Sequence, residues 1–195
     1  IWLLKENGEV IQLTDFKTSY KISYLAISSD GKTIAYTTDT QIHLLTAEGE
    51  ELFSSDGDVV YKNPVFSKDG ETLYYSINYD GSWRVESRNI HNLDTPINLV
   101  KGHIIKPCDG INCLYIIHYN DPILYKWQNG AIINTGINLG NIQSPDQFDI
   151  SGNIIHYVES VEGELYLKQY DMSSKNSRSI TKMSSPHFSL NNENG

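Results

Sequence analysis

The chain has 195 residues, of which 39% are hydrophobic and 20% charged, and its 24 acidic and 15 basic side chains give a formal charge of −9. This length and composition are typical of a single folded domain and exclude a disordered segment. The negative field repels phosphate, which argues against nucleic-acid binding by this segment, and no apolar run is long enough to insert into a bilayer.

Strands dominate the local pattern. Short runs rich in Tyr and β-branched residues alternate with breaks that contain Gly, Asn or Asp, and no run has the periodicity of an amphipathic helix. This pattern predicts an all-β fold. The chain starts at Ile1 with neither an initiator Met nor a signal-peptide pattern, so we interpret it as a segment of a longer protein.

Two sequence phrases recur along the chain with a common period of about 40 residues. The first phrase is a strand, a turn and a second strand, seen at 26–36 and 65–75 and, in weaker copies, at 106–116 and 147–157. The second phrase is a further strand, found at 1–4, 42–45, 83–86, 123–126 and 165–168. Four short strands per repeat predict a β-propeller blade, which is a four-stranded antiparallel meander. A β-sandwich also has closely spaced strands, but it gives no reason for two phrases to recur in register.

In chain order, we expect a single propeller domain with about four full blades and a partial blade at each end. The partial blades are predicted at 1–18 and 184–195, and the full blades at about 19–59, 60–101, 102–143 and 144–183. The chain opens in the third strand of a blade and closes in a first strand at 187–190, so the second strand of that blade is missing. We therefore predict an incomplete ring, whose open edge strands would allow pairing with another copy of the chain.

A glycine, usually after an Asp, marks the turn in each copy of the first phrase. These turn residues are Asp30, Gly31, Asp69, Gly70, Asp109, Gly110 and Gly152. We interpret them as structural, because acid/base catalysis would need two carboxylates that converge in a cleft. The nearby hydroxyls of Ser28 and Ser67 are expected to bond to local backbone.

The stretch from Phe66 to Tyr75, together with Ile1-Trp2 and Gln12-Leu13-Thr14, resembles the TolB-type, WD-like propeller repeat. This resemblance covers nearly the whole chain and implies a propeller fold. That repeat occurs in periplasmic scaffold proteins, in gating propellers of prolyl-oligopeptidase-like enzymes and in sensor domains. Residues 73–85 and 114–127 are in addition similar to the C-terminal propellers of CadC-like membrane-bound transcriptional regulators.

These resemblances imply three functions. The first is a non-catalytic periplasmic sensor domain of an inner-membrane CadC-like regulator, which would respond to a small signal ligand or a protein partner. The second is a TolB-like periplasmic scaffold that binds a partner protein, and the third is the gating propeller of a serine peptidase. An upstream winged helix and membrane helix would favour the first, a cleavable signal peptide the second, and a downstream hydrolase domain the third.

Cys108 and Cys113 flank a predicted hairpin loop, so their side chains could face each other across adjacent strands. A disulfide there would favour the periplasm over the cytosol, whereas two reduced thiols beside a turn are an equal alternative. Two cysteines without a second Cys/His pair at finger spacing do not indicate zinc.

The sequence lacks a nucleophile elbow, a zinc-binding helix motif and a phosphate loop, so we predict no catalytic residues, no cofactor and no metal site. Six histidines are scattered along the chain, and a pH-sensing role cannot be assigned to any one of them. Trp2, Trp83 and Trp127 fall in equivalent strands and are expected to pack between blades.

Overall fold

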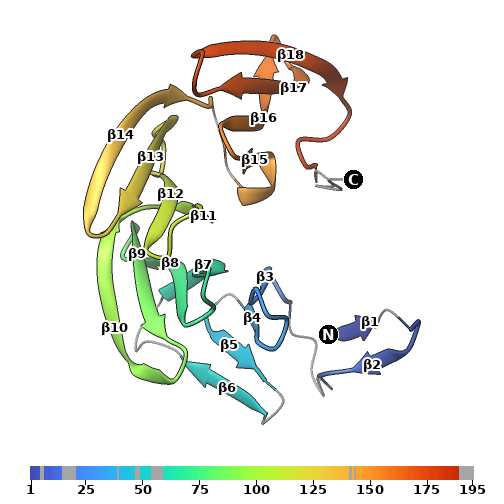
Figure 1. The fold of residues 1–195 in the computed structure, drawn as a ribbon, viewed down its shortest axis with the longest axis vertical. Helices are drawn as coiled ribbons and strands as arrows, with labels where there is room; N and C mark the ends of the chain where they lie inside the picture. Colours follow the sequence, from blue (N-terminus) through green and yellow to red (C-terminus); the bar gives the residue numbers. More distant parts are fainter. Residues whose placement is uncertain are drawn as a thin grey trace.

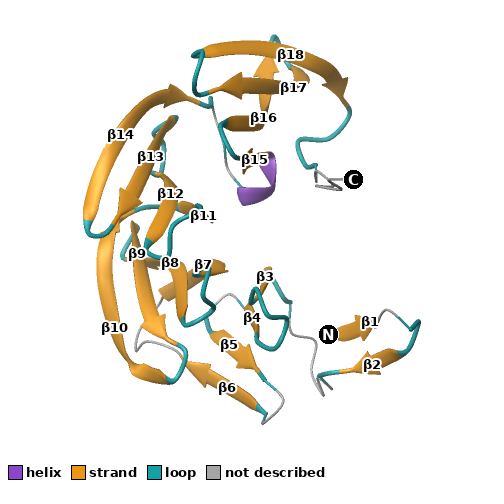
Figure 2. Ribbon diagram, in the orientation of Figure 1, coloured by secondary structure: helices purple, strands orange, loops and turns teal. Residues whose placement is uncertain are grey.

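The structure is a computed structural model, and it describes residues 1–4, 7–14, 21–38, 40–46, 49–53, 59–140, 142 and 144–188. Within these residues the chain forms antiparallel strands and one short 3₁₀ helix (Figure 2). The strands make four four-stranded sheets, which are preceded by a two-stranded sheet. The predicted all-β fold is confirmed.

The sheets follow one another along the chain, and neighbouring strands within each sheet are also neighbours in sequence. The two-stranded sheet comprises β1 (Trp2–Leu4) and β2 (Val10–Gln12). Blade 1 comprises β3 (Tyr24–Ile27), β4 (Ile34–Thr37), β5 (Ile42–Leu45) and β6 (Glu50–Phe53). Blade 2 comprises β7 (Val59–Phe66), β8 (Thr72–Tyr79), β9 (Ser82–Asn89) and β10 (Asn92–Lys101). Blade 3 comprises β11 (Ile104–Pro107), β12 (Cys113–Ile117), β13 (Ile123–Gln128) and β14 (Ala131–Asn138). After the 3₁₀ helix η1 (Pro145–Gln147), blade 4 comprises β15 (Phe148–Ser151), β16 (Ile154–Val161), β17 (Glu164–Asp171) and β18 (Asn176–Met183).

The four blades fan about a common axis, with the first strand of each at the centre and the fourth at the outside (Figure 1). This arrangement confirms the predicted propeller of four-stranded antiparallel blades. Among the described strands, β1 and β2 pair only with each other, so no backbone pairing joins them to blade 4.

The first strand predicted at 187–190 is not found as such. His187 and Phe188 lie outside any strand, and residues 189 and 190 lie outside the described part of the chain.

Tight hairpin turns set the register of the meander. The β8–β9 turn has Asp80 at φ 49° and Gly81 at φ 80°, and the β13–β14 turn has Asn129 at φ 49° and Gly130 at φ 86°. Two consecutive residues with positive φ match the twist of the flanking strands, and Asn-Gly and Asp-Gly pairs adopt this conformation most readily.

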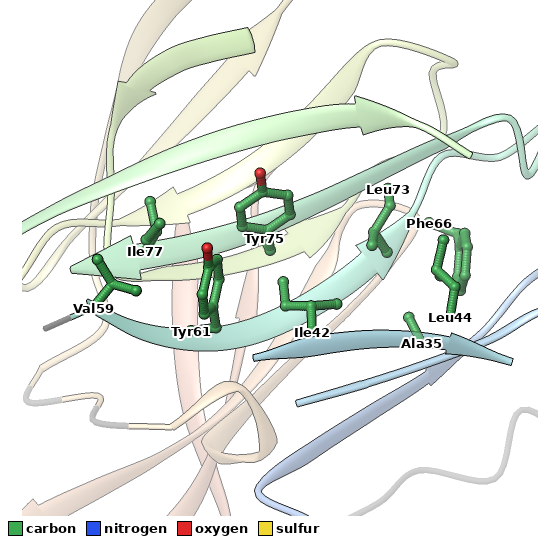
Figure 3. Close-up of a cluster of buried hydrophobic side chains, with 9 residues drawn as sticks. All are labelled: Ala35, Ile42, Leu44, Val59, Tyr61, Phe66, Leu73, Tyr75 and Ile77. Atoms are coloured by element: carbon green, nitrogen blue, oxygen red, sulfur yellow. The ribbon is translucent and has the colours of Figure 1, made fainter. Parts of the chain in front are cut away.

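Buried apolar side chains fill the spaces between neighbouring blades. The cluster between blades 1 and 2 comprises Ala35, Ile42, Leu44, Val59, Tyr61, Phe66, Leu73, Tyr75 and Ile77 (Figure 3). The cluster between blades 2 and 3 comprises Tyr74, Val85, Ile105, Leu114, Ile116 and Trp127. The cluster between blades 3 and 4 comprises Ile104, Ile117, Leu124, Ile137, Leu139, Ile142, Phe148, Ile155 and Tyr157. A single blade cannot bury both of its faces, so the stacking of neighbours stabilises the fold.

A polar network within blade 2 lies beside the cluster between blades 1 and 2, to which Tyr75 belongs. The hydroxyl of Tyr75 donates to Glu86 Oε2 at 3.0 Å and accepts from Arg88 Nε at 2.9 Å, while Arg84 Nε donates to Glu86 Oε1 at 2.9 Å. Glu86 is only 4% exposed and Arg88 only 6%. Burial raises the pKa of Tyr75 well above its ordinary value, so the phenol stays protonated and able to donate.

Gly102 lies where side chains of blades 2 and 3 pack tightly against the backbone. A Cβ atom at this position would lie 2.6 Å from Val85 Cγ2 and 2.7 Å from Ile116 Cγ2. Both neighbours are fully buried, so neither can move away without disturbing the packed interface.

Candidate functional site

The first strands of the blades face the centre of the arc (Figure 1). Three adjoining hollows, with volumes of about 560, 220 and 410 Å³, follow the first strands of blades 1 to 3. We call them together the axial groove. Its lining comprises Lys21, Ile22, Ser23, Tyr24, Leu25, Ala26, Ile27, Ser29, Val60, Tyr61, Lys62, Asn63, Pro64, Val65, Phe66, Ser67, Lys68, Ile105, Lys106, Pro107, Cys108, Asp109, Ser144 and Pro145.

Lysines make the axial groove locally basic in a protein of net charge −9. Lys62 Nζ lies 4.9 Å from the ring centroid of Trp83, a contact that holds the ammonium over the aromatic face. Lys106 Nζ lies 3.3 Å from Asp149 Oδ1, which joins the first strands of blades 3 and 4. Lys21, which also lines the groove, is exposed.

Apolar side chains lie between these lysines. Leu25 is 48% exposed, Ile27 is 55% exposed and Val60 is 38% exposed, and all three line the groove. Exposed aliphatic side chains beside polar groups in a hollow are typical of a surface that binds another molecule.

A β-bulge interrupts β7 in the middle of the groove. The pairing of β7 with β8 shifts register between Lys62 and Val65, and Asn63 adopts a left-handed φ of 51°. Its side-chain nitrogen donates to the carbonyl oxygen of His103 at 2.8 Å, which ties blade 2 to blade 3. Bulges of this kind re-aim side chains, often near functional sites. The sequence signal for it is Asn63-Pro64 inside a strand pattern, since Pro is disfavoured within strands.

His103 packs behind the bulge and is 5% exposed. Its ring centroid lies 4.6 Å from that of Trp83 and 5.3 Å from that of Tyr119. Burial, with a smaller contribution from Lys62, lowers the pKa of His103 to about 4, so this imidazole is neutral near pH 7.

The turn residues Asp30, Gly31, Asp69 and Gly70 lie in the hairpins that join the first two strands of blades 1 and 2. Ser28 Oγ donates to Asp30 Oδ1 at 2.7 Å, and Ser67 Oγ donates to Asp69 Oδ1 at 2.5 Å. These bonds, together with backbone N–H donors of the same turns, lower the pKa of both carboxyl groups. Each carboxylate is thus held within its own turn.

The weaker copies of the turn differ. Asp109 and Gly110 lie in the β11–β12 connection, where Gly110 is not in the left-handed region and the Asp109 carbonyl accepts from Lys68 Nζ at 3.5 Å. Gly152 adopts a φ of 57° after β15. The six histidines do not gather, and the described residues contain no group of three or more His, Cys, Asp or Glu side chains that could hold a metal ion.

A disulfide joins Cys108 to Cys113 at the end of the β11–β12 hairpin, beside the axial groove. The two Cα atoms are 5.3 Å apart, and Cys113 is 3% exposed. Among the described residues no cysteine is free.

Removal of this disulfide is expected to lower the free energy of unfolding by about 2 kcal/mol, because the bond closes only a short loop in the unfolded chain. The double variant Cys108→Ala, Cys113→Ala and the reduced wild-type chain should show the same fall in urea denaturation. Alkylation of the native chain without reductant provides the control. Two labelled thiols would contradict the bond.

A further hollow, of about 640 Å³, lies between the turns of blades 1 and 2. Its rim carries Glu71, which pairs with His91 at 3.0 Å, and its floor includes Leu44 and Ile90. In this hollow Asp30 pairs with Lys32, and Glu71 with His91. The axial groove, which is lined by the first strands of blades 1 to 3 and by Ser144 and Pro145, is therefore the better candidate site.

No protein-family model and no curated protein sequence matches the chain. Solved structures match it in fold. TolB from Acinetobacter baumannii has a TM-score of 0.67 and 17% identity over 95% of this chain and 49% of its own. A protein of Agrobacterium tumefaciens assigned as TolB has a TM-score of 0.66 and 16% identity over 87% of this chain and 65% of its own. An oligogalacturonate lyase, solved in complex with manganese, has a TM-score of 0.62 and 13% identity over 94% of this chain and 59% of its own.

The chain thus spans between half and two thirds of the length of these structures. At such low identity the likeness shows a shared TolB-like propeller fold. Because a lyase shares this fold, the fold alone does not decide whether the chain is catalytic. Within the described residues, no helix combines the length and the apolar character needed to cross a membrane.

Proposed function

We propose that this chain is a non-catalytic propeller scaffold that binds a protein partner in the axial groove. The observation that carries this proposal is the groove itself, in which Lys21 and Lys62 lie beside exposed Leu25 and Val60 on an otherwise acidic molecule. Such a surface favours a partner segment that presents acidic side chains beside apolar ones.

The likeness to two TolB structures supports this scaffold function more than the sensor function of a CadC-like regulator. The disulfide between Cys108 and Cys113 supports an oxidising compartment, and in a bacterium that compartment is the periplasm. A membrane-anchored parent protein would present the propeller in the same compartment.

Site-specific photocrosslinking tests the proposal. A photoreactive phenylalanine analogue is introduced at Val60 or Leu25 in the groove and, as matched exposed positions on outer strands, at Ile97 or Ile133. We expect one and the same partner to crosslink from both groove positions and not from the outer strands. Equal crosslinking from both surfaces would contradict the groove as the binding site.

Charge reversal at Lys62 is expected to weaken binding of the purified partner roughly tenfold, because like charges then face each other across the contact. The variant is Lys62→Glu, and its control is Lys175→Glu, which makes the same change in net charge at an exposed turn between β17 and β18. Isothermal titration calorimetry at two salt concentrations measures the affinity of each variant for the partner. If the two variants bind equally well, the basic groove does not select the partner.

A further inference from the structure

One buried side-chain atom of a residue that lines the axial groove has no hydrogen-bond partner among the described residues. Asn63 is 3% exposed, and its Nδ2 donates to the His103 carbonyl. Its Oδ1 is buried and accepts no hydrogen bond from the described residues. Leaving a buried carbonyl oxygen unpaired costs about 1–3 kcal/mol, so such a group in a folded protein requires an explanation.

Asn63 also has an unfavourable backbone conformation. Its φ of 51° is left-handed, and the following Pro64 further restricts the conformations open to it. The first strands of blades 1, 3 and 4 pair with their second strands without any register shift, whereas β7 is bulged at this point. The blade fold therefore does not require the bulge, and its effect is to set the Asn63 amide between blades 2 and 3.

The surroundings restrict what can satisfy the oxygen. Asn63 lines the 220 Å³ hollow of the groove together with Pro64, Pro107 and Pro145, and proline has no backbone N–H to donate. Lys106, on the same lining, is paired with Asp149. Three of the ten residues that line this hollow thus offer no backbone donor, and most of the others are apolar.

We propose that Asn63 Oδ1 anchors a neutral N–H group, such as a backbone amide of an extended peptide that lies along the first strands of blades 1 to 3. This inference rests on the proposed function, since it names the chemistry by which the axial groove holds its partner. A neutral donor is favoured because the site is buried and because Lys62 and Lys106 repel a cation. The first strands are edge strands, so an extended peptide can follow them.

Solvent does not reach Oδ1 in the free chain, so binding requires a small shift of the side chains around the hollow. A small molecule with a peptide-like amide can test whether a donor reaches Oδ1, even though the partner is not identified. N-methylacetamide carries one peptide-like N–H group, and N,N-dimethylacetamide has nearly the same shape but no donor.

Both probes are titrated into the full, uniformly ¹⁵N-labelled chain, and two-dimensional NMR follows the Asn63 side-chain amide and the backbone amides of Val65 and Lys106. We expect N-methylacetamide to shift these resonances in a saturable manner with an affinity roughly three- to tenfold above that of N,N-dimethylacetamide, as one hydrogen bond provides. Equal shifts with both probes, or none with either, would mean that an internal water or nothing satisfies the oxygen, and would overturn the proposal.

The variant Asn63→Gly keeps a residue that tolerates positive φ and removes only the side chain. It should abolish the preference for N-methylacetamide at Val65 and Lys106. Asn129→Gly, which replaces another left-handed Asn at a turn remote from the groove, should retain it. If Asn63→Gly does not fold, the comparison of the two probes on the wild-type chain decides alone. Crosslinking in the groove without a preference for N-methylacetamide would contradict the role of Asn63 and leave the scaffold function standing. A preference for N-methylacetamide without crosslinking in the groove would contradict the scaffold function and leave Asn63 Oδ1 as an acceptor.

Discussion

Replacement of Glu86 by Ala is expected to lower the free energy of unfolding by about 2–3 kcal/mol, because it removes a buried acceptor of the Tyr75 hydroxyl and the partner of Arg84. Glu86 accepts from Arg84 and from Tyr75, and Tyr75 in turn accepts from Arg88. For a chain of this length the thermal midpoint should fall by about 4–12 °C. Circular dichroism during heating and in urea measures both quantities.

Two variants sharpen this test. Glu86→Gln keeps the shape and an acceptor oxygen, so it should cost less than Glu86→Ala. Glu164→Ala removes a carboxylate that pairs with Lys182 at the exposed edge of blade 4, and it should leave the midpoint almost unchanged because exposed ion pairs contribute little. A loss for Glu86→Ala no larger than that for Glu164→Ala would show that the Tyr75–Glu86 network does not stabilise blade 2.

The second large effect is expected for Leu114→Ala, which should destabilise the chain by about 2–5 kcal/mol through loss of buried surface and the cavity left behind. Leu114 is fully buried between blades 2 and 3, in the same cluster as Trp127 and Ile116. The interface cannot close around the cavity easily, because Gly102 already brings Val85 and Ile116 close together there.

Ile133→Ala is the matched control, since Ile133 is 49% exposed on β14. It should change the urea midpoint by only a few tenths of a molar, because little of its surface is buried. Equal effects of the two substitutions would contradict stabilisation by packing between blades.

The strand and turn pattern of a single blade can be predicted from short stretches of the sequence. A strand pair around Asp69-Gly70, repeated at fixed spacing, depends on turn chemistry within a few residues, and such chemistry is visible without knowledge of the fold. The Asp80-Gly81 and Asn129-Gly130 hairpins follow the same rule, and the structure gives all four turn residues positive φ.

Contacts between blades could not be predicted in the same way. The expectation that Trp2, Trp83 and Trp127 all pack between blades holds for Trp127, which is 7% exposed, and is wrong for Trp2, which is 64% exposed. The difference depends on what lies on either side of each strand. β1 belongs to a two-stranded sheet, whereas β13 lies in a complete blade.

The axial groove could likewise not be predicted from residues close together in the sequence. Lys62 and Lys106 are far apart in the sequence, and only the stacking of blades 2 and 3 brings them to one lining. The bulge at Asn63 left a trace in the Asn63-Pro64 pair, but the unpaired oxygen depends on the position of the His103 carbonyl in the next blade. The buried partners of Glu86 depend in the same way on strand register, which places Tyr75 opposite it.

Each apolar cluster of this fold is shared by two successive blades and no more. Each blade is therefore coupled energetically to its nearest neighbours along a row. A structural change in the first blade can affect the last blade only through the blades between them. The middle units, which have a packed neighbour on both sides, are protected from fraying by the outer ones. The resistance of a blade to local unfolding therefore depends on its position along the row and is greatest for the middle blades.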